Sequence, residues 1–202
     1  MSTELLAGGQ GLATAERVPR VAPWLRRHRF WLIGAAALVV LALWADQWQQ
    51  QRELDRMTTA MASGEVQIST TDRYFDGVVA YYSPVIFRED PPAGLREGFQ
   101  TDVSEGAQDG MTGIAATAGE LDGITILPWH RHLLAARTAY ETRIAVWQAF
   151  LTQTTKDAGA LFDPVPGFEE SATATTAALQ LAVPSLGDAT VRARVTGVLP
   201  PH

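Results

Sequence analysis

The sequence predicts a mostly α-helical protein, in which one N-terminal transmembrane helix is followed by an extracytoplasmic bundle of three to four helices. Three observations support this prediction. Residues 30–45 form an uncharged apolar run, arginines cluster before that run, and apolar residues recur at helical spacing after it. We expect a disordered cytoplasmic tail with a basic cluster at 1–29, a transmembrane signal anchor at 30–48, the bundle at 49–183 and a C-terminal tail at 184–202.

The composition is that of a foldable, acidic chain. Hydrophobic residues make up 47% of the 202 residues and charged residues 19%. The net charge of −6 argues against a nucleic-acid partner, because such proteins carry a basic face. The lack of cysteine excludes disulfides, thiolate chemistry and cysteine-based zinc sites. Asparagine is absent and Lys156 is the only lysine, against 15 arginines, which indicates a GC-rich bacterial genome.

The apolar run FWLIGAAALVVLALWA, from Phe30 to Ala45, carries no charged side chain. As a helix it covers roughly 24 Å, or roughly 28 Å when it continues to Trp48, which is close to the thickness of the hydrocarbon layer. A buried helix of a globular domain would usually show a polar stripe, and this run shows none. We expect the following residues near its ends to lie at the membrane interface: Trp24, Arg26, Arg27, Arg29, Trp31, Trp44 and Trp48.

The arginines predict the orientation of the anchor. Five arginines precede the run, whereas the 20 residues after it hold only Arg52 and Arg56. The positive-inside rule then places the N-terminus in the cytoplasm, the span in the bacterial plasma membrane and the remaining chain outside. A cleaved signal peptide is the alternative. The long leader and the lack of a small-x-small site around Leu43, Trp44 and Ala45 favour an uncleaved anchor.

Helical periodicity continues after the apolar run. We expect the anchor helix to stop at Gly64 and a second helix to cover 65–83, ended by Pro84. A third helix should cover 93–121, where six glycines weaken it by ~1 kcal/mol each unless small residues allow close packing.

The strongest periodicity follows Pro128, a residue suited to the first turn of a helix. Its apolar stripe consists of Leu133, Tyr140, Ile144, Trp147 and Leu151. A last helix should cover 168–183, and the segment after Pro184 reads as either a short strand or a helix. Short connections between such helices favour an up-down bundle.

Two pairs of residues are candidate metal ligands. His130 and His132 are two residues apart, which on a helix directs them about 200° apart and away from a shared metal. Met57 and Met61 are spaced by four, which puts their thioether groups on one face of a helix, where both could bind a soft copper ion. We prefer the interpretation of surface histidines and core methionines, and expect no metal and no cofactor.

Aromatic residues give a candidate contact surface. Tyr81 and Tyr82 cannot both face the core of a regular helix, so one of them, together with Trp129, is a candidate for contact with another molecule. We find no motif of a catalytic site and expect no enzymatic activity. The sequence favours a membrane-anchored binding or accessory module, whose partners are the lipid bilayer and another membrane or envelope protein. The alternative is a small sensor or ligand-binding domain for a metal or an apolar molecule.

Overall fold

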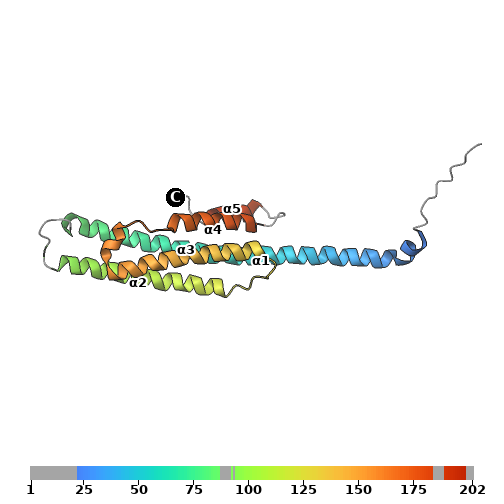
Figure 1. The fold of residues 1–202 in the computed structure, drawn as a ribbon, viewed down its shortest axis with the longest axis horizontal. Coiled ribbons are helices and arrows are strands. Elements are labelled where there is room, and N and C mark those ends of the chain that lie inside the picture. The colour runs from blue at the N-terminus through green and yellow to red at the C-terminus, as the bar shows by residue number, and fades with distance from the viewer. Residues whose placement is uncertain (1–21, 87–91, 93, 184–188, 199–202) are drawn as a thin grey trace, which may run out of the picture. The chain divides into compact units, whose positions relative to one another are not determined.

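A computed structural model describes residues 22–86, 92, 94–183 and 189–198. The structure is 88% helical and its described residues contain no strand, which confirms the predicted mostly α class. Its elements are α1 (Ala22–Ile86), α2 (Leu95–Asp122), α3 (Arg131–Lys156), the 3-10 helix η1 (Ala158–Phe162), α4 (Phe168–Ala182) and α5 (Ala189–Gly197) (Figure 1). The chain divides into two units, residues 1–44 and residues 45–202.

In the first unit, α1 carries the apolar run. Every side chain from Phe30 to Trp44 is exposed, Trp31 among them. Among the described residues, α1 is the one helix that is long and apolar enough to cross a membrane by length and composition. The helix begins at Ala22, so the backbone of Trp24, Arg26, Arg27 and Arg29 is helical. Residues 1–21 of the predicted tail lie outside the described residues.

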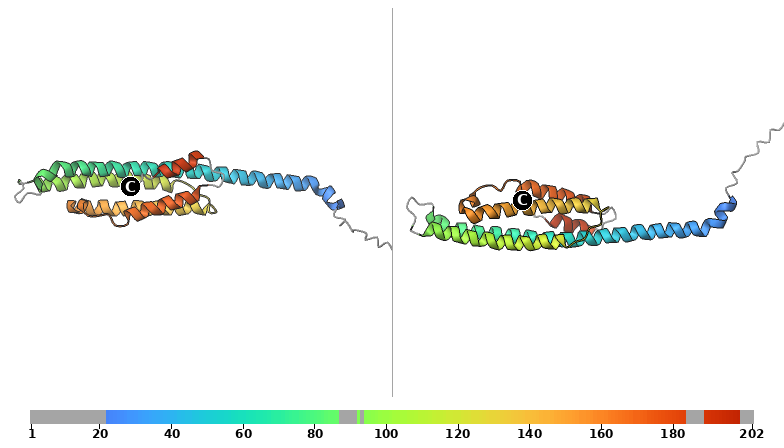
Figure 2. Two further views of the ribbon diagram at one scale, coloured as in Figure 1. Left: turned by 90° about the horizontal axis from the view of Figure 1, so that it is seen from above. Right: turned by 60° about the horizontal axis from the view of Figure 1, so that its bottom comes forward.

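The second unit is a bundle of four long helices, namely α1 from Ala45 onward, α2, α3 and α4, with α5 packed beside them (Figures 1 and 2). Consecutive helices run antiparallel. Tyr82 near the end of α1 touches Gly98 near the start of α2, whereas Gln67 touches Gly113 further along α2. The bundle therefore has the up-down order that the short connections predicted.

The predicted break at Gly64 is wrong, because α1 runs without interruption through that residue. Gly64 is buried, and a Cβ there would overlap the Tyr140 hydroxyl and stand 2.8 Å from Thr117 Cγ2. The glycine thus permits close packing of three helices, which outweighs its low helix propensity. Pro84 lies inside α1, two residues before its end, where its missing N–H removes a single backbone bond.

Four of the five glycines of α2 have the same role. Gly98, Gly106, Gly110 and Gly113 each lie against a side chain of α1, where an added Cβ would meet Tyr82, Tyr74, Thr71 and Gln67 respectively. Close helix packing over small residues is therefore the compensation that the sequence required. The predicted range of this helix, 93–121, matches α2 to within two residues.

The observed bounds of α3, α4 and α5 agree with the helices predicted from the apolar periodicity, apart from two differences. The stripe of α3 is buried throughout, and the predicted last helix matches α4. However, α3 begins at Arg131 and not at Pro128, because Leu127 to His130 form a turn in which the His130 N–H donates to the Leu127 carbonyl at 2.9 Å. The segment 189–197 is the helix α5, so the strand alternative for that part of the tail is wrong.

Candidate functional site at the start of the bundle

The predicted metal candidates do not come together in the structure. Met57 and Met61 are buried in the core, as expected, and His132 is exposed. His130 is only 6% exposed, so the expectation of a surface histidine is wrong there. The physical reason is a carboxylate on α1, which gives the imidazole a buried polar partner.

His130 lies between two carboxylates of α1. Its Nδ1 is 2.6 Å from Oε2 of Glu53, and its Nε2 is 3.3 Å from Oδ1 of Asp46. Glu53 is itself only 3% exposed, which makes this a buried polar contact. An ionised carboxylate only accepts hydrogen bonds, so both contacts are hydrogen bonds at once when the imidazole carries both ring protons.

Two further side chains complete this polar cluster, which we define as Asp46, Gln49, Glu53, Trp129 and His130. The indole N–H of Trp129 donates to Asp46 Oδ1 at 2.7 Å, and the Gln49 amide donates to Glu53 Oε1 at 3.1 Å. The cluster therefore fastens the connection between α2 and α3 to the first turns of α1 in the bundle.

The geometry of the cluster does not suit a metal or a catalytic base. Both ring nitrogens of His130 face carboxylates of the same helix, which leaves neither nitrogen directed at a third molecule. Within the described residues, no group of three or more His, Asp and Glu side chains is arranged to hold a metal ion. The arrangement positions the connecting loop.

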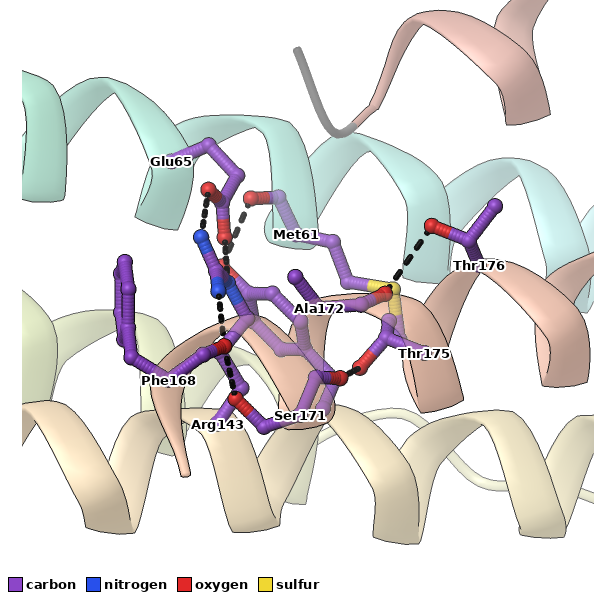
Figure 3. Close-up of polar contacts among 9 residues, drawn as sticks. Met61, Glu65, Arg143, Phe168, Ser171, Ala172, Thr175 and Thr176 are labelled. Carbon is purple, nitrogen blue, oxygen red and sulfur yellow. Dashed lines mark hydrogen bonds and ion pairs between the residues drawn. The ribbon is translucent and has the colours of Figure 1, made fainter. Parts of the chain in front are cut away.

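A second polar cluster lies deeper in the bundle. The guanidinium of Arg143 on α3 binds Glu65 on α1 through two hydrogen bonds of 2.8 Å, and it donates a third to the Phe168 carbonyl at 3.2 Å (Figure 3). It also lies 4.0 Å from the centre of the Phe168 ring. Arg143 is 1% exposed, so its charge depends entirely on these partners. This pair fixes the register of α1, α3 and α4.

Tyr140 stands one turn before Arg143 on α3. Its hydroxyl donates to the Met61 carbonyl at 2.9 Å, and its side chain is fully buried. Burial, followed by the nearby negative charge of Glu65, raises the pKa of Tyr140 far above its usual range. The phenol therefore remains protonated and keeps its hydrogen bond.

Four aromatic rings form a continuous patch, which we define as Tyr81, Tyr82, Phe99 and Phe162. The rings of Tyr81 and Tyr82 are 4.9 Å apart, those of Tyr82 and Phe99 5.5 Å, and those of Phe99 and Phe162 6.3 Å. Tyr82 and Phe99 are buried, whereas Tyr81 is 76% and Phe162 51% exposed. The sequence predicted that one of the adjacent tyrosines faces outward, and this residue is Tyr81.

A cavity of about 300 Å³ lies between α3 and the segment that leads into α4. Its lining is mainly apolar, with Gln153 and Asp163 as polar members, and Phe150 and Pro164 among the others. This volume is at the lower limit of sites for small molecules.

Sequence reasoning missed Glu53, Glu65 and Arg143. The sequence pattern could have revealed the two glutamates. Their positions, together with Met57 and Met61, are spaced by four and lie on one stripe of α1. A charged residue on an otherwise apolar stripe indicates a buried ion partner on another helix.

Comparison of the chain with protein-family models, with curated proteins and with solved structures found no match.

Proposed function

We propose that the protein is a membrane-anchored, non-enzymatic binding module, whose helical bundle lies outside the cytoplasm of a bacterium and contacts another membrane or envelope protein. The observation that carries the anchoring is the wholly exposed apolar run on α1. Side chains such as Leu38, Val40 and Leu41 would face water in a soluble protein at a cost of ~25 cal/mol per Å². A bilayer removes this cost.

The aromatic patch supports a protein partner. Tyr81 and Phe162 present large apolar rings to solvent, and each ring is held by a neighbouring aromatic ring. Aromatic side chains are enriched in protein interfaces, where rigid, well-supported rings act as anchors. The patch is built from α1, α2 and η1, so a partner would contact three parts of the bundle at once.

The orientation can be tested by labelling single cysteines, because the chain has none of its own. Ser63→Cys, at an exposed position of α1, should react with a membrane-impermeant maleimide in intact spheroplasts. Ser2→Cys should react only after lysis. Labelling of Ser2→Cys alone in intact cells would reverse the orientation, and a mature N-terminus near Asp46 would replace the anchor by a cleaved signal.

The protein contact can be tested by site-specific photo-crosslinking in cells. A photoreactive residue at Tyr81 should give one discrete crosslinked protein, which should co-purify in stoichiometric amount from mild detergent. The same residue at Val66, which is also exposed on α1, is the matched control and should give none. Equal crosslinking at both positions, or none at Tyr81, would contradict the use of the aromatic patch.

The cavity between α3 and the segment before α4 supports a second candidate, a small ligand-binding domain. Its mainly apolar lining suits a small apolar molecule. Gln153 and Asp163 could orient that molecule by accepting a hydrogen bond from a donor group on it. Native mass spectrometry of the detergent-purified chain separates the two candidates. A bound small molecule that Ala149→Trp excludes supports the ligand-binding domain, whereas a bound protein supports the binding module.

A further inference from the structure

The connection between α2 and α3 is apolar and partly exposed: Ile124 and Ile126 pack against the core, whereas Trp129 is exposed. Its residues 124–129, ITILPW, carry no charge, and the Trp129 indole at their end is 62% exposed. A connecting loop exposed to water is normally polar, because its side chains face solvent. This segment ends in a large aromatic ring, and most of the apolar surface of that ring is exposed to solvent.

The position of Trp129 along α1 is fixed. Its indole N–H donates to Asp46 at 2.7 Å, and the neighbouring His130 binds both Asp46 and Glu53. Asp46 directly follows the apolar run, which ends at Ala45. The loop is therefore attached to α1 at the residue where the apolar run meets polar sequence.

A second tryptophan marks the same level of α1. Trp48 is exposed, two residues after Asp46, and the Arg52 guanidinium lies 5.4 Å from the centre of its ring. Indole rings prefer the headgroup region of a bilayer, where the ring is apolar and the N–H finds a polar partner. Trp129 satisfies both conditions, since Asp46 accepts its N–H and its ring is exposed.

We propose that the loop 124–129 is a second membrane contact, which places Trp129 in the interfacial layer of the phospholipid bilayer that holds α1. This inference rests on the proposed membrane anchoring. The attachment to Asp46 and Glu53 holds the loop at the level of the bilayer surface, so the bundle is held at the membrane by two points and not by α1 alone.

The test uses the full chain in vesicles of phosphatidylethanolamine and phosphatidylglycerol. An environment-sensitive fluorophore is attached to Thr125→Cys in the loop, or to the matched control Thr101→Cys, another exposed threonine, near the start of α2. Leu38→Cys reports on the anchor. Quenching is measured with lipids that carry a nitroxide near the headgroup, for the loop, or on the acyl chain, for Leu38→Cys, and with iodide in the aqueous phase.

The fluorophores at Thr125→Cys and Leu38→Cys should lose most of their emission to the lipid-borne quencher, whereas the one at Thr101→Cys should respond to iodide alone. Trp129→Phe, which lacks the indole N–H, should shift the loop fluorophore from the lipid quencher toward iodide. If Leu38→Cys is quenched by lipid and Thr125→Cys behaves like Thr101→Cys, the loop contact is wrong and the anchor stands. If Leu38→Cys is not quenched by lipid, the anchor and the loop contact both fail. A loop fluorophore shielded from both quenchers also overturns the inference, since protein then covers the loop.

Discussion

The hydroxyl group of Tyr140 lies where a Cβ atom on Gly64 would stand. The same hydroxyl donates to the Met61 carbonyl, so it joins α3 to α1 across the point of closest approach. Position 64 therefore has no room for a side chain while Tyr140 stays in place. Tyr140 is fully buried and fixed by its hydrogen bond, and therefore cannot move aside for a larger residue at position 64.

Gly64→Ala should therefore destabilise the bundle by ~1–3 kcal/mol, the usual cost of overpacking a core. Gly77→Ala is the matched control on the same helix, because a Cβ at Gly77 meets no atom within 4 Å. That substitution should stabilise α1 by up to ~1 kcal/mol, as alanine is the better helix former. Urea unfolding of the full chain in mild detergent, followed by circular dichroism, measures both. Equal effects of the two substitutions would contradict the packing at Gly64.

The buried ion pair of Glu65 and Arg143 predicts that a single and a double substitution have different effects on stability. Glu65→Leu should destabilise the bundle by ~3–5 kcal/mol, because it leaves the charge of Arg143 buried with the Phe168 carbonyl as its remaining acceptor. The double substitution Glu65→Leu and Arg143→Met should recover much of this loss, since both charges are then removed from the core. A double variant that is less stable than Glu65→Leu would show that the arginine does not depend on Glu65.

Replacement by alanine should lower the stability of the bundle at His130 and leave it almost unchanged at His132. His130→Ala removes a hydrogen-bond partner of the buried Glu53 side chain and should cost ~1–3 kcal/mol of stability. His132→Ala, at an exposed position, should change the unfolding free energy by less than ~0.5 kcal/mol. Thermal unfolding of the two variants side by side gives the comparison. If His132→Ala proves the more harmful, the cluster around His130 does not fasten the loop.

Tyr140 predicts how stability changes at alkaline pH. Burial raises the pKa of Tyr140 above the ordinary value of 10.0, so the folded chain keeps a proton that the unfolded chain releases. Its contribution is therefore fully present below pH 10 and is lost as the pH rises above that value. Urea midpoints at several pH values from neutral to alkaline should fall above pH 10, and Tyr140→Phe should reduce the slope. Part of the slope should remain, because a hydrogen bond to Asp102 raises the pKa of Tyr82 as well.

The sequence predicted those parts of the fold that depend on local pattern. The stripe from Leu133 to Leu151 identified the buried face of α3, and the apolar run identified the exposed part of α1. Both predictions need only the spacing of apolar residues within a single helix. The continuity of α1 through Gly64 could not be predicted in this way. The reason for a glycine there is the close packing of Tyr140, which is distant in sequence and comes near only in the folded bundle.

The candidate site was harder to predict for the same reason. A glutamate such as Glu53 is usually solvated, and its burial rests on a contact with His130, which is 77 positions along the chain. Trp129 was predicted only as a candidate contact residue, and its attachment to Asp46 could not be read from the sequence, because the two residues are 83 positions apart. Long-range polar contacts leave little periodic signal.

Trp147 provides the last prediction, on what holds the bundle together. Its ring is buried and packs against Phe150 and Phe168, with ring centres 5.1 Å and 5.3 Å away. Trp147→Ala removes this contact between α3 and α4 and leaves a cavity, which should cost ~3–5 kcal/mol out of the ~5–15 kcal/mol typical of a domain. The full chain in detergent should then unfold at a much lower temperature. Trp48→Ala, at an exposed position of α1, should leave the melting temperature of the bundle almost unchanged. If Trp147→Ala melts like the wild type yet loses the crosslinked partner, that face of α3 binds another protein and is not part of the core.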